Sequence, residues 1–549
     1  VIFWASFLTL IAGGIGFAVR AGLLGAWGQQ YGFTQFELGQ ITGAGLWGFP
    51  IAIISLSFLV DRFGYGRVMV IAFLLHVLSA VVTLAATPTY LAVGNKAGAY
   101  WCLYLGFLLF SLANGACESV INPLTATLFP RNKTHWLNIL HAGWPGGLVI
   151  GTVIMLGFNG LGTALKQAIP WELPMAAFLV PVLIYGGMMF RRNFPHSEAK
   201  AANVPFGIML LEFLSPILLF LIVLHAMVGY VELGTDSWIT NITGTILDNR
   251  NLGLFLLVWT SLLMFVLRFF AGPIVHKISP LGLLFCSASI ACVGLLLLGQ
   301  FFHSMGSSLD TLWFLLLAAT VYGCGKTFFW PTMLGVVSER FPKGGALTLG
   351  VVGGVGMLSA GFLGGPIIGY EQDYYSAQSL SGNASAAYVR YQAEQKDSYL
   401  FLPEVNGLDN TKVGTLLGDP GENNGNGTKL NSDVKILRDK KEDLSKYPEL
   451  KKLADWWQGG FDAVPCDSAN PKPAACYAAS DTGPVTEARL NGGKMALSWT
   501  AAVPFCMAIG FLILILYFWS RGGYVAQVLL EHKANDEEFT GGVEGPADL

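Results

Sequence analysis

The sequence predicts an all-α polytopic membrane protein with twelve transmembrane helices in two pseudo-symmetric six-helix halves and one large extracytoplasmic insert. Three observations predict this fold class. Of the 549 residues, 53% are hydrophobic and only 12% are charged, which is about half the charged share of a soluble protein. Apolar runs long enough to cross a bilayer recur along the chain. One motif with a charged centre also occurs twice, at matching places in the two halves.

Each apolar run of about 20 residues predicts one membrane-spanning helix. The first run carries Arg20 and is long enough to span, so we interpret it as a mature helix and not as a signal peptide. The predicted spans lie near 3–27, 38–60, 67–87, 100–128, 136–158, 170–190, 216–241, 252–275, 280–302, 311–337, 346–369 and 495–520.

The spans and the polar segments between them divide the chain into six regions. With the N-terminus inside, the short inner loops carry ten Lys and Arg residues and the short outer loops carry three. This bias predicts that both termini are cytoplasmic, and we expect a bacterial inner (plasma) membrane. The regions are an N-terminal half (1–190), a cytoplasmic linker (191–205), spans seven to eleven (206–370), an extracytoplasmic insert (371–494), span twelve (495–520) and a cytoplasmic tail (521–549).

The repeated motif is GACESVINP at 115–123 and GCGKTFFWP at 323–331. Glycine opens both copies, proline closes both, and the one charged residue stands at the same position, as Glu118 and as Lys326. An unpaired charge at membrane depth costs about 2.5–3.5 kcal/mol on insertion scales. The repeat therefore predicts two related halves around a polar centre.

Two parallel halves of this kind are the plan of the major facilitator superfamily, and three stretches resemble that superfamily. VDRFGYGR (60–67) resembles its loop between spans two and three, which implies a gating latch at Asp61, Arg62 and Arg67. The alternative for this loop is a positive-inside anchor.

Span four, CESVINPLTATLFP (117–130), and span seven, VELGTDSW (231–238), resemble the fucose permease branch, the fucose–galactose–proton symporters. That resemblance implies proton-coupled sugar symport and a coupling role for Glu118 in span four. The branch also carries an acid in the middle of span one, where this chain has Ala21 beside Arg20. The two-acid relay of the family therefore cannot be carried over whole.

The predicted site lies where buried polar groups gather. Glu118 shares a helix face with residues four before and four after it, and burial in a low-dielectric cavity would let this acid load and release protons. Glu232 is the second proton-coupling candidate. The substrate-binding candidates are Arg20, Asn114, Asn122, His141, Glu232, Asp236, Trp238, Lys326 and Trp330.

Several candidates have a structural alternative. Glu118 could form a permanent ion pair with Arg20 or Lys326, Lys326 could form a fixed salt bridge between the halves, and Trp330 could simply pack. Asp236 could be solvated at the interface. Arg268, near the inner end of span eight, is expected to snorkel or to pair at the cytoplasmic gate.

The insert contains Cys466 and Cys476, which could form a disulfide in an oxidising compartment or remain free thiols. The sequence shows no metal-binding cluster, P-loop or nucleophile elbow. We therefore expect no enzyme activity and no cofactor, with the proton as coupling ion. The expected partners are a small solute and the lipid bilayer, not nucleic acid. A loop of this length also suggests a protein partner.

These observations favour a secondary transporter that moves a small polar solute, preferably a sugar, by proton symport and alternating access around a central site. Two alternatives stay open. Arg20 and Lys326 could clamp a carboxylate or phosphate, which would make the protein an organic-anion transporter. The chain could instead be a membrane scaffold or receptor that acts through the 371–494 insert.

Overall fold

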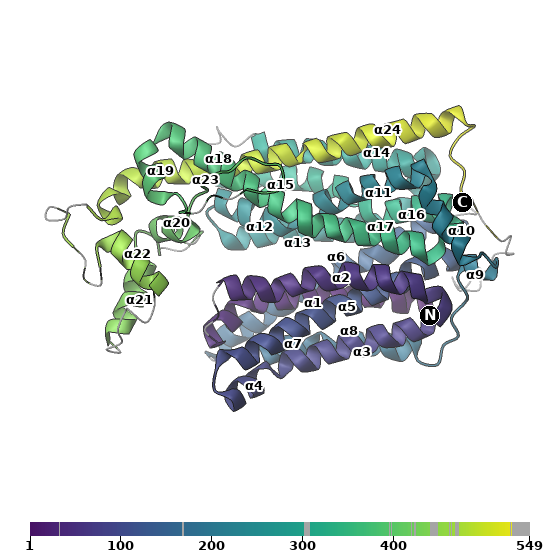
Figure 1. Ribbon diagram of the computed structural model, residues 1–549, viewed down its shortest axis with the longest axis horizontal. Coiled ribbons are helices and arrows are strands. Elements are labelled where there is room, and N and C mark those ends of the chain that lie inside the picture. Colours follow the sequence, from purple (N-terminus) through teal and green to yellow (C-terminus); the bar gives the residue numbers. More distant parts are fainter. Residues whose placement is uncertain are drawn as a thin grey trace.

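The computed structural model shows two helical bundles side by side, with a smaller helical region projecting from one end (Figure 1). It describes residues 1–529 except 32, 34, 167–168, 301–307, 395, 397, 419, 422–423, 440–447, 461, 463, 467–471 and 528. The described residues include twelve helical stretches long and apolar enough to cross a membrane. They are Ile2–Leu24, Gln40–Phe63, Tyr65–Leu84, Lys96–Leu128, Lys133–Gly162, Glu172–Met189, Pro216–Ile246, Asn251–Arg268, Ala271–Gly299, Thr311–Arg340, Pro342–Asn383 and Ala474–Ser520.

The N-terminal half is built from long helices. Its central span, α5, runs for 33 residues and begins at a cap in which Asn95 Oδ1 accepts from the Ala97 N–H, at 2.9 Å. The helix continues through Pro123. The helices of this half are α1 (Ile2–Tyr31), α2 (Gln35–Phe63), α3 (Tyr65–Leu84), α4 (Ala86–Val93), α5 (Lys96–Leu128), α6 (Lys133–Leu165), α7 (Glu172–Ala177) and α8 (Leu179–Met189).

The C-terminal half is built from interrupted helices. Spans seven and eleven each contain one π-helical turn, Tyr230–Gly234 and Ala360–Gly364. Spans eight and ten each break at two turn residues, after Arg268 and after Lys326. The helices are α11 (Pro216–Gly229), α12 (Thr235–Ile246), α13 (Arg250–Arg268), α14 (Ala271–Gln300, kinked at Ser279), α15 (Ser308–Lys326), α16 (Phe329–Arg340), α17 (Gly345–Ser359), α18 (Gly365–Asn383), α23 (Ala478–Thr500) and α24 (Ala502–Ser520).

The halves meet along two seams, α2 against α17 and α6 against α13 and α16. Glycines make the close approach possible, because a Cβ added to Gly350 of α17 would lie 1.8 Å from Ser57 Oγ of α2. Farther along the same seam, the rings of Trp47 and Phe362 meet edge to face at 4.3 Å. A linker with two short helices, α9 (Glu198–Ala201) and α10 (Phe206–Leu211), connects the halves.

The inserted region begins and ends as continuations of spans eleven and twelve. Helix α18 runs past the predicted boundary at residue 371 to Asn383, and α23 begins at Ala478, before the predicted span twelve. These two helices pack against each other, and a Cβ on Gly492 would lie 2.0 Å from Ser376 Oγ. Between them lie α19 (Ser385–Tyr391), α20 (Asn410–Leu417), α21 (Thr428–Asp439) and α22 (Pro448–Gln458).

The insert has a hydrophobic core of its own, which includes Tyr391 and Trp457. Arg390 forms two hydrogen bonds with the buried Asp481, Nε to Oδ2 at 2.8 Å and Nη2 to Oδ1 at 2.6 Å. The hydrogen bond to Asp481 raises the pKa of Arg390. A disulfide joins Cys466 and Cys476, whose Cα atoms are 5.7 Å apart. These contacts describe an independently packed unit and not an extended loop.

Candidate functional site

A chain of polar side chains connects the two halves at their centre. Asn122 Nδ2 donates to Glu118 Oε2 at 3.2 Å, and His141 Nε2 donates to Asn122 Oδ1 at 2.9 Å. The main-chain oxygen of His141 then accepts from Arg268 Nη1 at 2.6 Å, and Arg268 Nη2 lies 2.9 Å from Glu232 Oε1. All five side chains are at least nine-tenths buried. The two predicted proton-coupling acids therefore belong to one connected network.

The position predicted for Arg268 is wrong. It neither snorkels nor lies at a gate, because span eight continues as a second helix beyond it. Its Nε donates to the Thr327 carbonyl oxygen at 2.8 Å. That oxygen is free because Pro331, four residues later, has no N–H to donate to it. The proline that closes the second copy of the repeated motif thus creates the acceptor for Arg268.

The interruptions of the C-terminal half place helix ends at the site. Arg268 is the last residue of α13 and Lys326 is the last residue of α15, where the negative end of a helix dipole favours a cation. Near the start of α16, the Trp330 N–H donates to Glu232 Oε2 at 3.3 Å, where the positive end favours an anion. Arg268, Lys326 and Glu232 therefore each face a helix end of opposite sign.

Lys326 is completely buried, and its ammonium forms an ion pair with Asp236 of span seven. It also lies 5.3 Å from the centre of the Tyr322 ring. The pair therefore joins two spans of the C-terminal half. It is neither the predicted alternative of a salt bridge between the halves nor a pair with Glu118. Asp236 keeps 22% of its side chain exposed, so this end of the pair is solvated.

Arg20 does not reach the central network. Its Nη1 donates to the Gly16 carbonyl oxygen and its Nη2 to Ser79 Oγ, both at 3.2 Å. The guanidinium carbon lies 4.0 Å from the ring centre of Phe110 and 4.9 Å from that of Phe178, in cation–π geometry. The expectation that Arg20 faces the substrate cavity or pairs with a central glutamate is therefore wrong. The Arg20 guanidinium lies instead among aromatic rings inside the N-terminal half.

Asn114, expected beside Glu118, belongs to a second buried group. Its Oδ1 accepts from His76 Nε2 at 3.3 Å, and His76 Nδ1 lies 2.8 Å from the Tyr185 hydroxyl. Asn114 therefore shares the helix face of Glu118 but is bonded toward α3 and α8.

The two candidate tryptophans differ in position. Trp238 Nε1 donates to the Gly365 carbonyl oxygen at 2.8 Å and so joins span seven to span eleven. The Trp330 ring lies 4.6 Å from the ring of His225, whose two nitrogens are buried without a recorded partner. Trp330 thus belongs to the central site through both its ring and its N–H, whereas Trp238 packs between two spans.

The comparisons with known proteins agree with this architecture. The family model of the Major Facilitator Superfamily matches residues 5–365. The chain is a member of the Major Facilitator Superfamily. No curated protein sequence matches the chain.

Solved transporters of this superfamily share the fold. The E. coli fucose–proton symporter has 17% identity and a TM-score of 0.53, over 68% of this chain and 92% of its own. The proton–xylose symporter has 14% identity and a TM-score of 0.57, over 69% and 90%. The human organic anion transporter MFSD10 has 15% identity and a TM-score of 0.52, over 70% and 94%.

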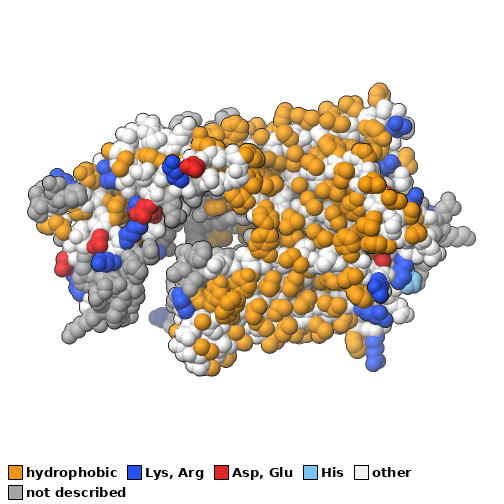
Figure 2. Space-filling view, viewed as in Figure 1, with side chains coloured by type: hydrophobic (Ala, Val, Ile, Leu, Met, Phe, Trp, Pro, Cys, Tyr) orange, Lys and Arg blue, Asp and Glu red, His pale blue; other side chains and the backbone are white. Residues whose placement is uncertain are grey.

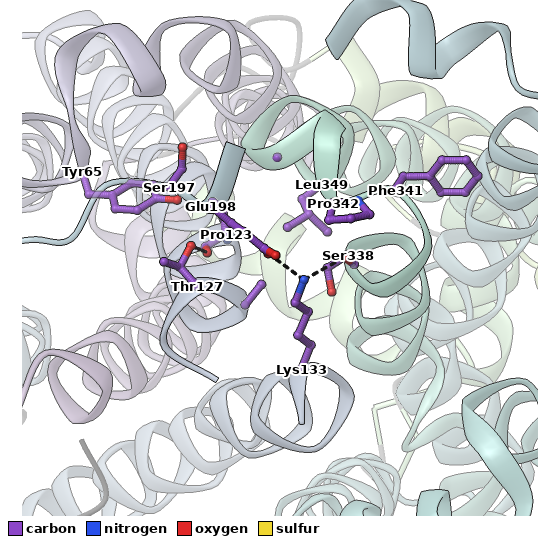
Figure 3. A pocket seen from close by; sticks show the side chains of 12 residues that line it. Tyr65, Pro123, Thr127, Lys133, Ser197, Glu198, Ser338, Phe341, Pro342 and Leu349 are labelled. Atoms are coloured by element: carbon purple, nitrogen blue, oxygen red, sulfur yellow. Dashed lines mark hydrogen bonds and ion pairs between the residues drawn. The ribbon is translucent and has the colours of Figure 1, made fainter. Parts of the chain in front are cut away.

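In this superfamily member the two halves are tied together at the end where α1 begins and α24 ends. Figure 3 shows Lys133 pointing toward the linker residue Glu198 and toward Ser338 of the C-terminal half; the distances from its Nζ are 2.7 Å to Glu198 Oε2 and 3.1 Å to the Ser338 carbonyl oxygen. Beside this pair, the Thr134 hydroxyl donates to Glu339 Oε1 at 2.6 Å. These bonds cross between the halves, so this end of the transporter is closed.

The linker also holds the predicted gating loop. The Ser197 hydroxyl donates to Asp61 Oδ1 at 2.5 Å, and Lys200 Nζ donates to the Asp61 main-chain oxygen at 2.9 Å. Arg62 and Arg67 are exposed. Asp61 therefore contacts the linker, whereas the two arginines point into solvent.

The described part of the tail lies against the same end. The Tyr524 hydroxyl donates to Glu339 Oε2 at 2.7 Å, and the Gln527 N–H donates to the Glu339 main-chain oxygen, also at 2.7 Å. The Leu529 N–H donates to Glu198 Oε1 at 2.8 Å. The tail thus bonds to the two carboxylates that close this end; residues 530–549 lie outside the described part of the chain.

Proposed function

We propose that this transporter carries out proton-coupled symport of a small polar solute, preferably a neutral sugar, by alternating access around the central network. The observation that carries the proposal is the connection from Glu118 through Asn122 and His141 to Arg268 and Glu232. It spans both halves, so a proton bound at one of its acids changes a contact between the parts that must move. The fucose and xylose symporters that share the fold support the solute class.

Glu118 is the proposed proton carrier because its partner is neutral. The recorded bond to its carboxylate comes from the amide of Asn122, whereas Glu232 and Asp236 face the cations Arg268 and Lys326. A buried carboxylate without a paired cation carries a large desolvation cost, which binding a proton removes. Protonation of Glu118 would therefore stabilise the closed, dehydrated intermediate through which the solute passes.

The charge balance of the site favours a neutral solute. Three central carboxylates, Glu118, Glu232 and Asp236, face two central cations, Arg268 and Lys326. Protonation of Glu118 brings this set from a net charge of −1 to zero. Because both cations are already paired, neither is available to clamp a carboxylate or phosphate. The organic-anion alternative, which relied on Arg20 and Lys326, has less support from this geometry.

Uptake into proteoliposomes under an imposed pH gradient tests the proposal. Wild-type protein should accumulate a labelled sugar when the gradient is imposed, and Glu118→Gln should reduce that uptake to the level found without a gradient while it keeps solute exchange. The matched control is Glu487→Gln, an exposed glutamate of the insert. Gradient-driven accumulation by Glu118→Gln would overturn the coupling role, and competition by acidic but not neutral sugars would overturn the solute class.

The proposal also includes the orientation of the protein in the membrane and the side on which the insert lies. Both termini would lie in the cytoplasm of a bacterial cell, so the tied end described above would be the cytoplasmic gate and the insert would lie outside. A scaffold or receptor role for the insert has no support from the buried charged network, because an anchor does not need paired ionisable groups at its centre.

A further inference from the structure

One segment of the insert returns to the surface of span eleven. This segment, Tyr399–Pro403, is called here the Tyr399 loop. The Tyr399 hydroxyl donates to the Phe362 carbonyl oxygen, and the Tyr370 hydroxyl donates to the Pro403 carbonyl oxygen at 2.6 Å. Two tyrosines, one from the loop and one from the helix, therefore fix both ends of the loop against one membrane-spanning helix.

The acceptor on span eleven follows from the local helix geometry. Phe362 lies inside the π-helical turn Ala360–Gly364. Pro366, four residues after Phe362, has no N–H to donate to the Phe362 carbonyl oxygen. The Tyr399 hydroxyl donates to that oxygen instead.

A main-chain hydrogen bond closes the loop, and its apolar side chains are exposed. The Leu402 N–H donates to the Tyr399 carbonyl oxygen at 2.9 Å, and Pro403 has no N–H to satisfy. Leu400 is 65% exposed and Phe401 is 86% exposed. Two large apolar side chains are thus presented next to each other on a turn that a main-chain hydrogen bond closes.

The loop lies at the level of the membrane boundary. Seventeen residues separate Phe362 from Gly345, the start of α17, which corresponds to about 26 Å of helix against a hydrocarbon core of about 30 Å. Beyond Phe362, spans eleven and twelve carry stacked aromatic pairs: Tyr370 and Tyr374 at 5.9 Å, and Tyr375 and Trp499 at 6.5 Å. Tyrosine and tryptophan are enriched at this boundary in membrane proteins.

We propose that Leu400 and Phe401 insert into the interfacial layer of the lipid leaflet on the insert side, so that the insert rests on the bilayer. Figure 2 shows the apolar surface of the C-terminal half continuing up to the base of the insert. Phe362, whose carbonyl oxygen holds the loop, is itself an exposed apolar residue whose ring meets Trp47, so the loop lies beside further apolar side chains. Lipid is therefore the occupant that covers the two side chains.

Photo-crosslinking in liposomes tests this contact directly. The full-length protein would carry p-benzoylphenylalanine in place of Phe401 and, in a control variant, in place of Val389. Val389 is 65% exposed on α19 of the same insert, so it matches the loop in exposure but not in position. After illumination in phosphatidylcholine liposomes, intact-mass spectrometry should find a lipid adduct several times more often at position 401 than at 389. Equal lipid yields at the two positions, or a cross-link from 401 to another segment of this chain, would overturn the proposal. The result does not depend on whether the protein transports a sugar.

Discussion

The two halves hold their central acids in opposite ways. In the N-terminal half, Glu118 lies on the unbroken helix α5 and its recorded partner is a neutral amide. In the C-terminal half, Glu232 lies in a π turn between helices, where a guanidinium and a helix N-terminus both face it. Continuous helices leave a buried carboxylate without compensation, whereas broken helices bring dipole ends and cations to it. In the mechanism proposed above, the same pseudo-symmetric plan thus provides one acid to exchange a proton and one acid held as an anion.

Removal of the positive charge of Arg268 should have the largest effect on stability and transport. Arg268→Gln would leave Glu232 buried without a counter-charge, and breaking a buried pair in this way costs about 3–5 kcal/mol. We expect a clear fall in thermal stability in detergent and loss of transport. The double variant Arg268→Gln/Glu232→Gln removes both charges and should recover much of the stability. If the single variant is as stable as wild type, Glu232 is not held as an anion and the contrast between the halves fails.

The Lys326–Asp236 pair should give an intermediate effect. Its carboxylate is partly exposed, so solvent screens the loss of the partner. We expect Lys326→Gln to reduce stability by about 1–3 kcal/mol and to reduce uptake without abolishing its dependence on the pH gradient. The measurement is thermal unfolding together with gradient-driven uptake, and Asp236→Asn/Lys326→Gln is the matched control. Loss of the gradient dependence in Lys326→Gln would move the coupling role from Glu118 to this pair.

Substitution of Arg20 in the N-terminal half should have the smallest effect on stability and transport. Arg20 is held by phenylalanine rings and neutral oxygens, so Arg20→Met replaces a cation by a flexible apolar side chain in an apolar cage. Such replacements of buried charges are often neutral or stabilising, and we expect proton-dependent uptake to persist. A folded Arg20→Met protein whose uptake ignores the pH gradient would show that Arg20 does act on the central site.

The fold and half of the network follow from sequence patterns. Apolar runs predict the twelve spans, and the four-residue spacing of Glu118 and Asn122 predicts their contact, because both lie on one helix face. The roles of Arg20 and Arg268 could not be predicted in this way. Which neighbour an arginine meets depends on how each helix is rotated in the bundle and on where its span breaks. The break at Arg268 depends on tertiary contacts such as the bond to Thr327, 59 residues away in the sequence.

The π turns of spans seven and eleven lie against each other, since a Cβ added to Gly234 would approach Gly364 Cα to 2.7 Å. Two π turns in contact could act as one hinge, an elbow shared by spans seven and eleven. A bend of about 10° there would swing the far end of α18, about 28 Å away, by about 5 Å. Because α18 leads directly into the insert, a movement at this elbow would tilt the whole insert, and the tilt of the insert would report on the transport cycle.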